Sequence, residues 1–240
     1  SEAVYYIIHS GGKVTGFIRV NESVDHREGK IGLRVVRLAG RKTDDGTVLT
    51  HEDLFAAADG SFDQWRRIER VGDRASLEEG LRQKELLLIH RQSQGAPRAT
   101  KQRKLAPVIR GAYLPPAMEM MVLRLILGKG ERRAYGFAVY NAIKTDFDMR
   151  TVTLVGPDAV RLGGSKRQAT RLTDQMAQDA PTADVWVDKH GRMLKMAAPR
   201  RTSVLLTSRQ EVLKRFAEEL QAARRLPTWV KDTAPHRPLR

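Results

Sequence analysis

Methionine and aromatic side chains are the residues in this sequence that most suggest binding chemistry. Met118, Met120 and Met121 lie close together and precede Leu125. Methionine is flexible and polarizable, so it suits surfaces that accept apolar molecules of varied shape. We expect these residues to line one wall of a cavity, and the full set of expected ligand-binding residues is Met118, Met121, Leu125, Trp65, Phe137, Tyr140 and Trp186. An ordinary filled core is the alternative, because the same residue types fill protein interiors.

Basic residues form a second candidate site in the polar, proline-broken segment Gln92 to Arg110, which we expect to be a loop. The expected anion-binding or partner-binding residues are Arg98, Lys101, Arg103, Lys104 and Arg110. Such a segment can be a solvated loop, or it can contact anionic lipid head groups or an acidic protein surface. Nucleic acid is a weaker candidate, because the segment has no aromatic residue before Tyr113 on which a base could stack.

Residues suited to catalysis are scattered. The six histidines include no pair at i, i+4 spacing that would suit a metal on a helix, and there is no G-x-S-x-G motif. The run Gly163-Gly164-Ser165-Lys166 is similar to a phosphate-binding loop but lacks the upstream glycine, so it predicts a turn. We expect the carboxylate pair Glu78-Glu79 to lie in an exposed stretch, without the desolvation that acid–base catalysis requires. The sequence therefore predicts no catalytic residue, no metal site and no cofactor.

The overall charge is the main compositional signal. The 240 residues carry a formal net charge of +15 with no cysteine, which excludes disulfides, thiolate metal sites and cysteine nucleophiles. A surface this basic attracts polyanions. The longest apolar run, Met118 to Leu127, is interrupted by Glu119 and Arg124, so it does not predict a membrane span.

Short β-type runs between Gly, Asp or Asn turns dominate the chain and predict about ten strands. Pro116 to Leu127 is bounded by proline and by Gly128, which predicts a buried central helix. Ser208 and Glu211 form a capping-box pattern that opens a C-terminal amphipathic helix. The expected organisation is a single domain over residues 1–225, followed by a basic, proline-containing and poorly ordered tail over 226–240.

The order of these elements resembles the bacterial lipoprotein-localisation-factor superfamily. The points of resemblance are an opening hairpin with Tyr5-Tyr6 and Gly11-Gly12, the central helix, and a late hairpin from Val185 to Met196. The resemblance implies an incomplete β-barrel with helices on its open side. We therefore predict an α+β, mostly β fold in which a curved antiparallel sheet surrounds the central helix. The segment Gln92 to Arg110 and the C-terminal helix depart from the family pattern.

These observations lead to three functional hypotheses. The first is a non-catalytic protein of the bacterial envelope, periplasmic or exported, that binds an apolar small molecule or lipid in the half-barrel. The second is a basic nucleic-acid-binding protein, and the third is a structural or assembly protein with a filled core. The sequence leaves a cytoplasmic location and the oligomeric state open.

Overall fold

The structure, a computed structural model, describes residues 2–129, 133–199 and 201–230. These residues divide into two compact units. Unit 1 comprises residues 1–3, 16–105 and 210–240, and unit 2 comprises residues 4–15 and 106–209, each over its described part. The single domain expected over residues 1–225 stays a prediction. Of the tail expected to be poorly ordered over 226–240, residues 226–230 pack within unit 1 with Val230 buried, and residues 231–240 lie outside the described residues.

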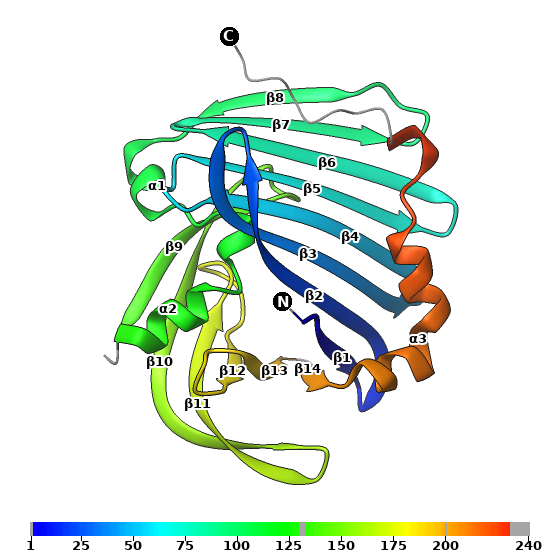
Figure 1. The fold of residues 1–240 in the computed structure, drawn as a ribbon, viewed down its shortest axis with the longest axis vertical. Coiled ribbons are helices and arrows are strands. Elements are labelled where there is room, and N and C mark those ends of the chain that lie inside the picture. Colours follow the sequence, from blue (N-terminus) through cyan, green and yellow to red (C-terminus); the bar gives the residue numbers. More distant parts are fainter. Residues whose placement is uncertain (1, 130–132, 200, 231–240) are drawn as a thin grey trace. The chain divides into compact units, whose positions relative to one another are not determined.

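The sheet of unit 1 is an antiparallel meander in which neighbouring strands follow one another in the chain (Figure 1). Its strands are β2 (Lys13–Arg27), β3 (Lys30–Thr43), β4 (Gly46–Ala57), β5 (Phe62–Val71), β6 (Arg74–Gln83), β7 (Leu86–Ser93) and β8 (Ala99–Lys104). The first three residues of β2 belong to unit 2. Short turns between successive strands fix the register, so each residue has a defined cross-strand neighbour.

Helix α3 (Arg209–Arg224) lies beside the sheet of unit 1 (Figure 1). Its buried stripe is formed by Val212, Phe216, Leu220 and Ala223, whereas Leu213, which the sequence also places on this stripe, is exposed. The ring of Phe216 lies 5.4 Å from that of Phe17 on β2. The 3-10 helix η2 (Thr228–Val230) continues this contact, since Val230 packs with Ile68 and Leu77 of the sheet.

The strands of unit 2 form a second antiparallel arrangement, in the order β1-β14-β13-β12-β11-β10-β9. They are β1 (Val4–Ser10), β9 (Ala134–Asn141), β10 (Asp146–Leu162), β11 (Ser165–Gln175), β12 (Ala183–Val187), β13 (Met193–Ala198) and β14 (Thr202–Thr207). The helices of this unit are α1 (Pro107–Ala112), the 3-10 helix η1 (Pro116–Met118) and α2 (Val122–Lys129). Helix α2 lies against the β12–β13 turn, where Gly191 leaves room for the Arg124 side chain.

The predicted fold class is confirmed, because the described chain is mostly β and its curved antiparallel sheet does not close into a barrel. Two local predictions are wrong. Residues 92–110 are not one loop, since they contain β8 and most of α1. The helix expected over Pro116 to Leu127 is divided, because the Pro115 carbonyl accepts an i+3 bond from Met118 and α2 begins only at Val122. Gly128 does not end α2, which continues to Lys129.

Gly80 leaves room for the indole of Trp65, its cross-strand neighbour. A Cβ atom at Gly80 would lie 2.0 Å from Cζ2 of Trp65. Because Trp65 is only 2% exposed, the ring has little freedom to move away.

We therefore expect Gly80→Ala to lower the free energy of unfolding by about 1–3 kcal/mol, the usual cost of overpacking a core. Gly136→Ala is the control, because its Cβ would meet only Cε of Met149, at 3.9 Å. Urea denaturation of both variants measures the difference. Equal midpoints would show that the close Trp65–Gly80 contact does not limit stability.

Candidate functional site

A row of charged residues with alternating sign crosses five strands of unit 1. Its members are direct cross-strand neighbours on one face of the sheet, in the order Arg37, Glu52, Arg67, Glu78 and Arg91. Opposite charges at facing positions attract each other across a sheet. We call this set the charge row.

Ion pairs hold the charge row together. One carboxylate oxygen of Glu52 accepts a hydrogen bond from Nε of Arg37. The other accepts a hydrogen bond of 2.6 Å from Nε of Arg67. Glu78 accepts from Nη2 of Arg91 at 2.6 Å and from the indole nitrogen of Trp65 at 3.3 Å. The Glu52 side chain is 1% exposed, so its charge is stabilised by these partners rather than by water.

The protonation of Glu52 follows from these contacts. Burial raises the pKa of its carboxyl group, but the charges and hydrogen bonds of Arg37 and Arg67 outweigh burial and lower the pKa to about 2. The same carboxylate raises the pKa of Arg67 against the opposing effect of burial. Glu52 is therefore ionised and fully hydrogen-bonded near neutral pH, which suits a structural role and not proton transfer.

The opposite face of the same strands carries a second group of ion pairs. Asp53 accepts from Nε and Nη2 of Arg34, both at 2.9 Å, and from Nη2 of Arg27 at 2.8 Å. Two strands further, on β6, Glu79 accepts hydrogen bonds from Nε of Arg66 at 2.7 Å and from Nη2 of Arg98 at 2.8 Å. Burial raises the pKa of Asp53, and hydrogen bonds with Arg34 and Arg27 outweigh it, so the pKa lies below its ordinary value.

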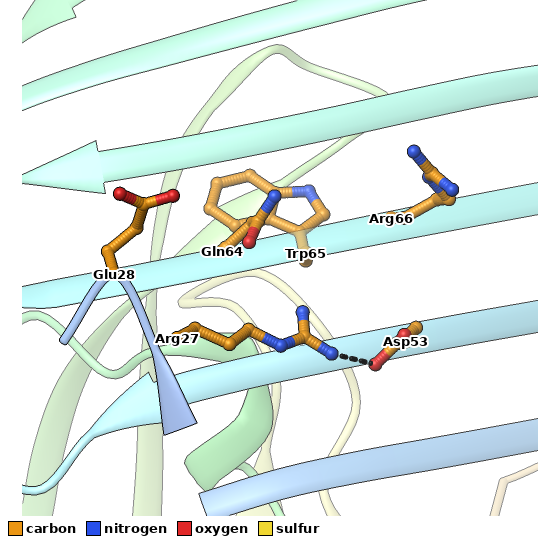
Figure 2. Close-up of a pocket in the computed structure, with 6 residues that line it drawn as sticks. All are labelled: Arg27, Glu28, Asp53, Gln64, Trp65 and Arg66. Carbon is orange, nitrogen blue, oxygen red and sulfur yellow. Dashed lines mark hydrogen bonds and ion pairs between the residues drawn. The ribbon is translucent and has the colours of Figure 1, made fainter. Parts of the chain in front are cut away.

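This second face contains a pocket of about 310 Å³. Figure 2 shows the six residues that line it, which are Arg27, Glu28, Asp53, Gln64, Trp65 and Arg66. Glu28 lies in the β2–β3 turn, to one side of Gln64, and Arg66 lies to the other side. Within the described part of the chain, the side chains of Glu28 and Gln64 make no hydrogen bond or ion pair, so both can bind a ligand. A pocket of this size can hold a small organic molecule.

Apolar side chains lie on the same sheet face as this pocket. The guanidinium of Arg27 lies 5.4 Å from the ring centroid of Phe55. Phe55 is the cross-strand neighbour of Gln64 and packs with Phe62, Leu81 and Leu88 in a hydrophobic cluster. The pocket therefore combines charges of both signs with a neighbouring apolar cluster.

The expected ligand-binding residues do not form one group of contacts. Trp65 belongs to unit 1 and lies against Gly80. In unit 2, Phe137 and Tyr140 are three residues apart in β9, so they point to opposite faces, and Tyr140 packs edge-on against Phe147 at 6.0 Å. Trp186 donates to Asp158 at 2.8 Å and lies under the ammonium of Lys195.

The expected methionine wall is only partly buried. Met118 ends η1 and Met121 precedes α2, and both are partly exposed. The sulfur of Met121 accepts from Nη1 of Arg124 at 2.9 Å. Leu125 is 54% exposed, whereas Val122 and Ile126 carry the buried side of α2.

Four of the five expected anion-binding residues lie in a strand or helix, and only Arg98 lies in the connection before β8. Arg98 pairs with Glu79, and Lys104 pairs with Glu85 at 3.1 Å. Lys101 and Arg103 are on β8, and Arg110 is in the last turn of α1. Arg98 is therefore already engaged by a buried carboxylate.

Of the six residues that line the pocket, Trp65 is among the expected ligand-binding residues and the other five are not, and the expectation for Glu78-Glu79 also fails. Both carboxylates are buried in β6 and paired with arginines, one on each face, so the expectation of an exposed stretch is wrong. The usable signal was the series of adjacent like charges Glu52-Asp53, Arg66-Arg67 and Glu78-Glu79, alternating in sign from strand to strand. Adjacent residues of a strand point to opposite faces, so this series predicts an ion-pair row on each face.

Comparison with known proteins supports the type of fold, but it does not assign the chain to a protein family. No protein-family model matches the chain, and no curated protein matches its sequence. The structure is similar to the crystal structure of a beta-barrel-like protein of domain of unknown function DUF1849 from Brucella abortus. The TM-score is 0.54 and the identity 13%, over 86% of this chain and 95% of that chain. A barrel-like fold is thus supported, whereas membership of the lipoprotein-localisation-factor superfamily is not.

Within residues 2–129, 133–199 and 201–230, no group of three or more histidine or acidic side chains is placed to hold a metal ion. No helix in the same part of the chain is long and apolar enough to cross a membrane.

The depressed pKa of Glu52 predicts how stability depends on pH. The folded-state pKa of about 2 lies below the ordinary value of 4.5, so ionised Glu52 stabilises the fold above about pH 4.5. This contribution, on the order of 3 kcal/mol, is lost as the pH falls from 4.5 towards 2.

We expect Glu52→Gln to lower the free energy of unfolding by about 3–5 kcal/mol near neutral pH, because it leaves two arginines without their carboxylate. The variant should also lose part of the acid dependence between pH 4.5 and 2. Denaturant titrations over this range measure both effects. An unchanged pH slope would show that Glu52 is not the group responsible.

Proposed function

We propose that this protein is a non-catalytic binding protein that holds a small amphiphilic molecule with a zwitterionic head in the pocket of unit 1. The observation that carries the proposal is the presence of charges of both signs around two unengaged polar side chains, Glu28 and Gln64. Arg27 and Arg66 supply the positive charges, and Glu28 supplies a carboxylate that makes no ion pair with any of the described residues.

The mixed charge selects against ligands that carry only one sign. A purely anionic group that approaches Arg27 and Arg66 also meets the carboxylates of Asp53 and Glu28. A purely cationic group that approaches Glu28 and Asp53 also meets the guanidinium groups of Arg27 and Arg66. A zwitterion can place its anionic part near the arginines and its ammonium near Glu28, so both charges gain a charge-assisted hydrogen bond.

The apolar part of the proposed ligand follows from the surroundings of the pocket. The cluster around Phe55 lies on the same sheet face; its core is buried, and its partly buried member Leu88 is the side chain that a hydrocarbon group would contact. This fits the apolar or lipid ligand expected from the sequence, with the difference that the candidate pocket is largely polar. The absence of a catalytic role and the envelope location remain parts of the proposal.

Lipid extraction and a lysolipid titration test this function. Organic extraction of freshly purified protein, followed by mass spectrometry, should identify a co-purifying amphiphile. Lysophosphatidylethanolamine should bind with higher affinity than lysophosphatidylglycerol, which lacks the ammonium group. Titration calorimetry with delipidated protein measures both affinities.

We expect Glu28→Gln to weaken binding of lysophosphatidylethanolamine about tenfold, the usual effect of losing a hydrogen bond to a charged group. Lysophosphatidylglycerol should bind no more weakly to this variant than to the unaltered protein. Asp44→Asn is the matched control, since Asp44 is an exposed carboxylate in another hairpin turn of unit 1. Equal effects of the two substitutions, or no binding by the unaltered protein, would contradict the proposed function.

A further inference from the structure

The β10–β11 hairpin of unit 2 carries a concentrated group of cations at its tip (Figure 1). Gly163 and Gly164 form the turn with φ values of 55° and 83°, in the left-handed region that glycine adopts without strain. Register places Arg161 opposite Lys166 and Val160 opposite Arg167. We call Arg161, Lys166 and Arg167 the hairpin cations.

The hairpin cations form no ion pair with a carboxylate in the described part of the chain; Asp158, further down the same hairpin, has its pKa lowered mainly by the hydrogen bond from Trp186 and to a smaller extent by the charge of Lys166. All three cations are exposed, and none makes a side-chain hydrogen bond with the described residues. Residues 159–169 contain no Asp or Glu. By contrast, Arg171 at the base of the hairpin pairs with Asp184 at 3.1 Å. Like charges at facing positions repel each other, so the tip is stabilised by any anion that binds there.

The hairpin is held in place by apolar contacts behind the tip. Val160 and Leu162 are buried and pack with Leu194 and with partly buried residues of β12 and β14. Because alternate residues of a strand point to opposite faces, Arg161 and its partner Lys166 project on the face away from these two side chains, whereas Arg167, the partner of Val160, is on their face. The cations are therefore presented from a fixed element of the fold.

We propose that the hairpin tip docks onto a membrane surface rich in anionic phospholipid. The charge is confined to residues 161–167, next to a compact Gly-Gly turn, so the tip can meet a flat array of phosphates end-on. A ribbon that lies in a nucleic-acid groove makes contacts along its length, and residues 159–169 contain no aromatic side chain on which a base could stack. This inference rests on unit 2 alone and is independent of the pocket in unit 1.

Vesicle sedimentation tests the docking surface. At low salt, the full chain should sediment with vesicles of phosphatidylcholine mixed with phosphatidylglycerol, and not with vesicles of phosphatidylcholine alone. The triple variant Arg161→Gln, Lys166→Gln, Arg167→Gln should bind the anionic vesicles more weakly, by roughly fivefold for each charge removed. Its circular dichroism and thermal midpoint should match those of the unaltered protein, because the three side chains are exposed.

A control variant separates local docking from the net charge of +15. Arg41→Gln, Arg74→Gln, Lys84→Gln removes the same charge from exposed positions of unit 1 and should retain most of the vesicle binding. Equal losses in the two triple variants would overturn the proposal in favour of unspecific attraction. Failure of the unaltered protein to sediment would also overturn it. So would a hairpin variant that lost binding to duplex DNA and kept its binding to anionic vesicles.

Discussion

The ion pairing of Glu52 with Arg37 and Arg67 is the interaction on which the sheet of unit 1 most depends. An ionised carboxylate that is 1% exposed requires partners on both sides, so β3, β4 and β5 must pair in one register. A slip of one residue would turn the charges to the other face and leave them without counter-ions. The hydrophobic pattern alone would separate the native register from a shifted one less strongly, because both faces of these strands carry apolar side chains.

Paired buried charges recur elsewhere in the molecule. Asp63 accepts from Nε of Arg82 inside unit 1, and Asp174 receives both Nε and Nη2 of Arg150 inside unit 2. Buried ion pairs add little net stability compared with apolar packing, but an unpaired partner is costly. The chain thus uses pairs of arginine and carboxylate to specify strand alignment in both units.

The sequence predicted the type of fold better than the site. Gly and Asp turns between β-type runs identified most strands, and the stripe Val212, Phe216, Leu220 identified α3, because these signals are local. The pocket joins Arg27 and Glu28 to Gln64 and Arg66 from another hairpin, and only register brings them together. Residues 99–104 were missed as a strand because β8 is almost entirely exposed and therefore lacks the apolar alternation by which strands are recognised.

The way the two units share the chain has a consequence for synthesis. Strands β2 to β8 are joined by short turns, so each can pair with its predecessor as it leaves the ribosome. Strand β1 is made first, yet its partner β14 begins at Thr202, and α3 follows later still. The edge of β1 that pairs with β14 is therefore exposed through most of translation, and an unpaired strand edge is a site of aggregation. The interval before β14 appears is the period in which a chaperone would be of most use to this protein.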